Sequence, residues 1–118
     1  MNIEEVRLYC LAKKGVTEDT PFGSDTLVFK VIGKMFALMN LEGALQLNLK
    51  CDPEEAIRLR EEFDAVLPGY HMNKKHWNTI IVDGRITENQ IRKWIDDSYR
   101  LVVLKLTKKE QVFISNND

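Results

Sequence analysis

The segment 26–50, TLVFKVIGKMFALMNLEGALQLNLK, contains three short apolar stretches separated by two glycine-containing turns. Residues 26–32 and 35–40 predict two strands, because Gly33-Lys34 between them suits the two-residue turn of a tight hairpin. Residues 45–50 predict a third, strictly alternating strand in which leucines face one way and Gln46, Asn48 and Lys50 face the other. Strands joined by such short turns run antiparallel, so this segment predicts an antiparallel sheet with one face of at least one strand exposed to water.

Helix start signals flank this segment on both sides. Asn2 and Thr87 each precede a Glu or Gln by three residues, which is the spacing of a capping box. Asp52-Pro53 is followed by two glutamates, which favour the first turn of a helix. We therefore expect helices that begin at these three positions. The last helix is expected to bury a stripe at helical spacing, formed by Ile91, Trp94, Ile95, Ser98 and Val102.

The order of the predicted elements defines the fold class. A helix, three strands, a helix, one or two strands that include residues 77–82, and a final helix are typical of an α+β fold. We expect a single compact domain in which one antiparallel β-sheet has helices packed on one face. The 118 residues match the length of one ordinary domain. The last stretch, about 107–118, is expected to be a frayed C-terminal tail.

Composition excludes several classes of protein. An apolar content of 44% with 30% charged residues excludes a disordered or collagen-like chain. No apolar run approaches the 18 residues of a membrane span, and the N-terminus resembles neither a signal peptide nor a transit peptide, so we expect a cytoplasmic protein without a membrane partner. The net charge of −1 excludes a strongly basic domain. We expect a monomer, with Cys10 and Cys51 as free thiols.

The stretch 71–79, HMNKKHWNT, carries the densest group of candidate binding residues. Lysine and histidine offer cations to phosphate, asparagine can hydrogen-bond base edges, and tryptophan offers a stacking surface. The alternative is an exposed Lys-Lys turn followed by a tryptophan that belongs to the core. The candidate residues of this stretch are His71, Asn73, Lys74, Lys75, His76, Trp77 and Asn78.

A second candidate surface is the polar face of the predicted sheet. If all helices cover the other face, Asn48 and Lys50 point outward beside Lys30 of the first strand. The alternative is a solvated sheet face without a partner. Trp77 and Thr79 share one face of their strand and His76 and Asn78 share the other, but alternation alone does not say which pair lies beside Asn48.

Motifs for catalysis or for cofactor binding are missing from the sequence. It contains no phosphate-binding glycine loop and no nucleophile elbow around a serine. The five-residue spacing of His71 and His76 fits no common metal pattern. Cys51 lies near a helix start but beside Asp52, and it is better explained as a small buried hydrophobe. We therefore expect a protein that is not an enzyme, with no catalytic residue, no metal and no cofactor.

Four stretches of the chain resemble the MmcQ/YjbR family of small bacterial proteins. They are residues 15–38, 48–53, 68–83 and, more weakly, 95–106. The resemblance implies a CyaY/frataxin-like α+β fold, also described as a double-wing motif, and a DNA-binding role that rests on the likeness of this fold to phage transcription-factor domains. Carried over to this chain, that role is expected at Lys74, Lys75, His76, Trp77 and Asn78, with Asn48 and Lys50 on the neighbouring face.

Three functional hypotheses follow from the sequence. The first is a DNA-binding protein that uses the open polar sheet face and the 71–79 stretch. The second is a protein-interaction module on the same sheet face. The third is a small-molecule binder or an enzyme with a pocket near Tyr70, His71 and His76.

Overall fold

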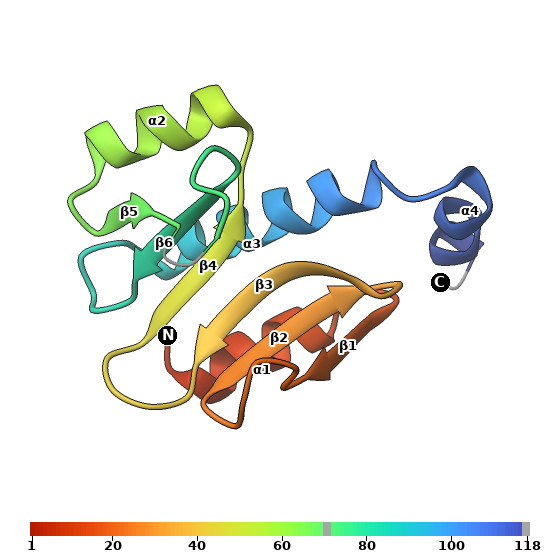
Figure 1. Cartoon of the computed structure of the whole chain (residues 1–118), viewed down its shortest axis with the longest axis horizontal. Coiled ribbons are helices and arrows are strands. Elements are labelled where there is room, and N and C mark those ends of the chain that lie inside the picture. Colours follow the sequence, from red (N-terminus) through yellow and green to blue (C-terminus); the bar gives the residue numbers. More distant parts are fainter. Residues whose placement is uncertain (70–71, 117–118) are drawn as a thin grey trace.

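The computed structural model describes residues 1–69 and 72–116. In this part of the chain six strands form one fully antiparallel sheet in the order β1-β2-β3-β4-β6-β5. The helices α1 and α3 lie behind the sheet in Figure 1, and no described helix lies in front of it. The strands are β1 (Val16–Asp19), β2 (Thr26–Val31), β3 (Lys34–Asn40), β4 (Gln46–Lys50), β5 (Val66–Pro68) and β6 (Trp77–Ile81), and the helices are α1 (Ile3–Leu11), α2 (Pro53–Glu62), α3 (Glu88–Val103) and α4 (Lys108–Asn116).

The core lies between the sheet and its helices. Alternation turns Leu47 and Leu49 of β4 towards α3, where both are buried. The predicted α+β fold, with a single antiparallel sheet and helices on one face, is confirmed. Of the helices in the described residues, none has the length and apolarity needed to cross a membrane.

The β2–β3 hairpin turns one residue earlier than predicted. Its two turn residues are Ile32 and Gly33, with φ angles of 46° and 79°. A type I′ turn needs two such left-handed residues, and this is the turn whose twist matches the flanking strands. The expected Gly33-Lys34 turn is therefore wrong by one position, because Lys34 already belongs to β3.

All three predicted helix starts are confirmed, but among them the full capping box is present only at Asn2. The Oδ1 atom of Asn2 accepts from the Glu5 amide at 2.8 Å, and the Glu5 carboxylate accepts from the Asn2 amide in return. Thr87 accepts from the Gln90 amide at the start of α3, whose predicted stripe is buried at all five positions. Asp52 precedes α2 as expected but makes no side-chain cap bond.

Residues 107–118 were expected to form a frayed tail, but residues 108–116 form helix α4. Thr107 and Glu110 make a reciprocal capping box. The Thr107 amide donates to the Glu110 carboxylate at 2.9 Å, and the Glu110 amide donates to the Thr107 hydroxyl at 3.1 Å. Ile114 anchors the helix because its side chain is buried in the main core. The T-x-x-E spacing was a readable signal for this helix.

A serine hydroxyl joins α3 to two neighbouring strands. The pairing of β3 with β4 ends at Ala37 and Leu49. At the next position Ser98 of α3 donates to the Phe36 carbonyl at 2.5 Å and accepts from the Lys50 amide at 2.8 Å. The hydroxyl therefore takes the place of a strand-to-strand hydrogen bond, and it fixes the end of β4 where Lys50 lies.

Candidate functional site

The helix-free face of the sheet carries a small apolar cluster of its own. Val28, Leu38 and Trp77 are buried there, with Met35 and Met72 packed against them. The Gly69 amide donates to the Trp77 carbonyl at 2.8 Å and so holds Gly69 beside β6, and Met72 packs over this face. The prediction of an open and polar face is therefore wrong for the middle of this face, which is apolar and buried beneath Met35 and Met72.

Trp77 lies on the helix-free face but does not form a stacking surface. Its register partner is Lys50, which places the indole on the same face as Asn48. Met72 packs against this cluster, and only 7% of the Trp77 surface is exposed. The expectation that Trp77 stacks on a ligand is wrong for this conformation, and the alternative of a core tryptophan is correct.

Asn78 faces the helices and is unavailable to a ligand on the open face. It is 2% exposed, and its Nδ2 atom donates to the Ala56 carbonyl at 3.3 Å. Its Oδ1 atom has no hydrogen-bond partner among the described residues. It lines a small cavity of about 20 Å³ with Cys51, Glu55 and Asp97. The expected contact of Asn78 with a base edge is therefore wrong.

The tip of the 69–76 loop keeps the expected exposed cations. Lys74 and Lys75 are exposed, and the turn that presents them is fixed by Asn73, whose Oδ1 atom accepts from the Lys75 amide at 3.0 Å. His76 is partly exposed, and its carbonyl accepts from the Cys51 amide at 2.8 Å. The predicted site residue His71, like Tyr70, lies outside the described residues.

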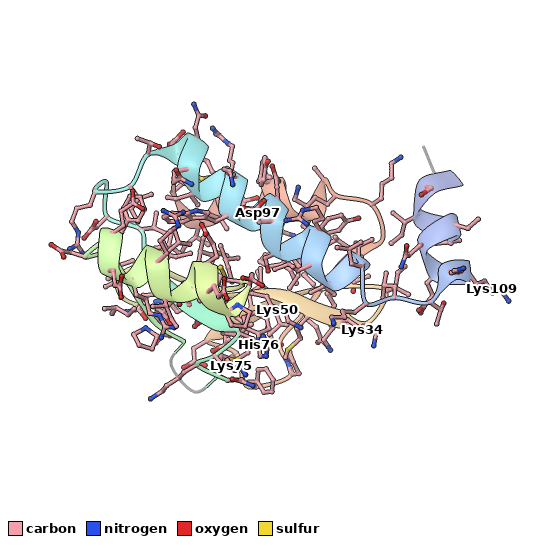
Figure 2. The ribbon with its side chains drawn as sticks, turned by 90° about the horizontal axis from the view of Figure 1, so that it is seen from above. Lys34, Lys50, Lys75, His76, Asp97 and Lys109 are labelled. Atoms are coloured by element: carbon pink, nitrogen blue, oxygen red, sulfur yellow. The ribbon has the colours of Figure 1, made fainter. Side chains whose placement is uncertain are left out.

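Lysines without a carboxylate partner gather along one side of the molecule. Figure 2 shows Lys75, His76 and Lys50 following one another from the loop towards the sheet. Lys34 begins β3 and Lys50 ends the antiparallel neighbour β4, so both lie at the same end of this strand pair. None of these lysines forms an ion pair among the described residues, although Lys34 is near enough to Glu110 to help lower the pKa of that carboxyl. We call this set the lysine band, and it consists of Lys34, Lys50, Lys74 and Lys75.

Many basic side chains elsewhere are paired, although Lys108 and Lys109 on α4 form no ion pair among the described residues either. Lys30, predicted as a site residue, lies 3.7 Å from the Asp19 carboxylate across the β1–β2 pair. Arg7 forms an ion pair with Glu18, which lowers the pKa of that carboxyl. Further pairs on the helices hold Arg58, Arg92, Lys93 and Arg100. Lys30 is thus partly neutralised and does not belong to the lysine band.

A groove of about 420 Å³ crosses the helix-free face between the loop 20–25 and the loop 69–76. Phe22 precedes β2 and Met72 lies in the loop before β6, so by strand order Leu38 of β3 lies between these two lining residues. Asn48, a predicted site residue, contributes an amide group to the same groove. Sequence reasoning missed Phe22 and Met72, although an aromatic residue inside the turn-forming stretch TPFGSD was a readable signal.

Both cysteines are free, and neither is activated. Burial raises the pKa of Cys10 to about 12, and burial together with Glu55 and Asp52 raises the pKa of Cys51 to about 11. In addition, no group of three His, Cys, Asp or Glu side chains in the described residues could hold a metal ion. The described side chains around these thiols therefore favour structural roles.

The raised thiol pKa values lead to a chemical prediction. At pH 7.5 only about one Cys51 in several thousand would be a thiolate, which is the reactive form. We expect iodoacetamide to label the folded protein at least about tenfold more slowly than the protein unfolded in guanidinium. Mass spectrometry over a time course measures both rates, and equal rates would contradict the assigned burial.

The fold and the candidate site together define a class: a small α+β domain whose antiparallel sheet is covered by helices on one face and carries a grooved, lysine-flanked surface on the other. The YjbR family model matches residues 11–101, and the chain belongs to this family. The predicted resemblance is therefore confirmed.

Relatives from two bacteria share the sequence over different lengths. YjbR of Escherichia coli K12 is 33% identical over 112 residues, which are 94% of this chain and 95% of that protein. YbdF of Escherichia coli O157:H7 is 42% identical over 92 residues, 77% of this chain and 75% of that protein. YyaQ of Bacillus subtilis is 46% identical over 55 residues, 47% of this chain and 46% of that protein.

Solved structures share the fold. A crystal structure of the Deinococcus radiodurans protein DR2400, with domain DUF419, has a TM-score of 0.90 at 36% identity and covers 97% of this chain and 88% of that one. A crystal structure from Pseudomonas syringae has a TM-score of 0.75 at 29% identity and covers 86% of this chain and 98% of that one. None of these names assigns a ligand or an activity.

Proposed function

We propose that this protein binds nucleic acid and that the lysine band contacts the phosphate backbone. The observation that carries the proposal is that none of these lysines forms an ion pair among the described residues, although acidic residues outnumber basic ones by 18 to 17. A lysine that is already paired must lose its partner before it contacts phosphate, whereas an unpaired lysine releases only counterions from the nucleic acid. The band is therefore the surface of this near-neutral protein best suited to a polyanion.

The burial of Trp77 and Asn78 supports a particular kind of contact. Lysine contacts to phosphate position a protein on a nucleic acid without reading its sequence. The two residues of the 71–79 stretch best suited to stacking and to base-edge contacts are turned into the protein. Binding by the lysine band is accordingly sequence-tolerant and depends strongly on salt.

A salt series tests the proposal. Fluorescence anisotropy with a labelled oligonucleotide is measured from low to physiological salt. Contacts from about four lysines should give a slope of log K against log salt of about −3.6 on duplex DNA and about −2.8 on a single strand. The absence of binding at low salt, or a slope near zero, would overturn the proposal.

Charge reversal at the loop tip should remove most of this affinity. Lys74→Glu/Lys75→Glu replaces two exposed attractive charges by repulsive ones, so we expect affinity at low salt to fall more than tenfold and the slope to become shallower by about 2. The control is Arg92→Glu/Lys93→Glu on α3, which makes the same change in net charge. An equal loss in both variants would mean that net charge, and not the lysine band, controls binding.

A further inference from the structure

The groove on the helix-free face has the size and shape of a ligand site. Its volume of about 420 Å³ lies within the range of roughly 300–1,000 Å³ typical of small-molecule sites. Phe22, which is 62% exposed, contributes an aromatic ring to its lining that a ligand can reach. Met72 and Leu38 also line the groove, which leaves a slot with apolar surfaces.

The polar groups of the groove are neutral, and some are unused. Asn48 accepts from the Thr79 hydroxyl at 2.6 Å through Oδ1, and its Nδ2 donor has no partner among the described residues. The side chain of Gln46 is exposed at the same end of the groove. The Asn40 side chain, in contrast, is fully engaged with the backbone of the β3–β4 turn. No charged side chain lines the groove, so the group that fits it is flat, neutral and able to hydrogen-bond along one edge.

A free cation lies close to one side of this neutral groove. Lys74 follows Met72 by two residues, so their Cα atoms lie at most about 7 Å apart. A ligand that presents flat neutral groups beside regularly spaced negative charges matches both features. A nucleic-acid strand has this chemistry, with bases for the groove and phosphates for the lysines.

We propose that the groove holds one unpaired base of a single-stranded nucleic acid, between Phe22 and Met72, with the edge of the base at Asn48. This inference rests on the proposed function and specifies it. In a duplex the bases are stacked and paired inside the helix, so the groove can accept a base only from a single strand or from a distorted site. The protein therefore prefers a single strand over a duplex of the same charge.

The test compares three labelled ligands with the same number of phosphates, namely oligothymidylate, the matching abasic phosphodiester strand and a duplex of half the length. We expect the unmodified protein to bind oligothymidylate about tenfold more tightly than the abasic strand. This difference in affinity lies within the range that stacking of one base on an aromatic side chain provides. Phe22→Ala should remove this preference and leave abasic binding and the salt slope unchanged. The control is Phe113→Ala on α4, because Phe113 is similarly exposed at 55% but lies away from the groove.

The outcomes separate the two proposals. Equal binding of oligothymidylate and the abasic strand, with no effect of Phe22→Ala, would overturn the groove assignment and leave phosphate binding by the lysine band intact. Tighter binding of the duplex than of the single strand would also overturn it. No binding of any ligand by the unmodified protein would overturn both proposals. Because Phe22 is largely exposed, circular dichroism should show an unchanged fold in Phe22→Ala.

Discussion

Replacing Ser98 by alanine should lower the free energy of unfolding by about 2–4 kcal/mol. The Ser98 hydroxyl is fully buried and joins the Phe36 carbonyl to the Lys50 amide. Alanine leaves both backbone groups buried without this partner, and each unsatisfied group costs about 1–3 kcal/mol. The change in volume is small, so the expected loss comes from hydrogen bonding rather than from a cavity.

Urea denaturation followed by circular dichroism measures this effect. The control is Ser115→Ala, because Ser115 is exposed on α4 and its replacement should change stability by less than about 0.5 kcal/mol. A loss below that level in Ser98→Ala would show that the strands close on each other without the hydroxyl. Because Ser98 also fixes the end of β4, oligonucleotide affinity of the folded variant should fall through displacement of Lys50.

Replacing Gly69 by alanine should displace the 69–76 loop and weaken both stability and binding. A Cβ atom at this position would lie 2.7 Å from the Trp77 Cβ and 2.8 Å from the Trp77 carbonyl oxygen. Both atoms belong to β6, which is held between two strands and cannot easily move. We expect a loss of about 3 kcal/mol, at the upper end of the usual cost of overpacking. Oligonucleotide affinity should fall about tenfold, because the loop carries half of the lysine band.

Tryptophan fluorescence in a Trp94→Phe background reports on this displacement. Trp77 is then the one remaining tryptophan of the sequence, and a raised loop should shift its emission to longer wavelength. The control is Gly84→Ala, where a Cβ meets nothing within 4 Å and only the backbone angle of 95° is strained. Unchanged emission and affinity in Gly69→Ala would mean that the loop does not depend on its close approach to Trp77.

The sequence predicted those parts of the fold that depend on neighbouring residues. The capping box at Asn2 and the stripe of α3 depend on side chains three or four positions apart, and both are present in the structure. The short strands β1 and β5 were not predicted. Val16–Asp19 has only one apolar residue, and Val66–Pro68 ends in proline, so both become strands only through pairing with β2 and β6.

The candidate site was predicted in part. The exposure of Lys74 and Lys75 followed from their place in a polar loop and is confirmed. The sequence could not show that Lys30 is paired and therefore less available to a ligand. Its partner Asp19 lies eleven residues earlier, on a strand that was not predicted. The groove could not be predicted from the sequence either, because its lining brings together Phe22 and Met72, which are fifty residues apart.

The sequence alone determined the α+β class, the antiparallel hairpins, the helix starts and the family of this protein. These features rest on local periodicity, turn chemistry and motif content, which act over a few residues. Only the tertiary structure decided whether Trp77 is buried or exposed. Alternation placed Trp77 and Thr79 together, but the burial of the indole depends on Met35 and Met72, which pack against its cluster from other parts of the chain. Contacts between distant segments determine which side chains meet water, and therefore which can meet a partner.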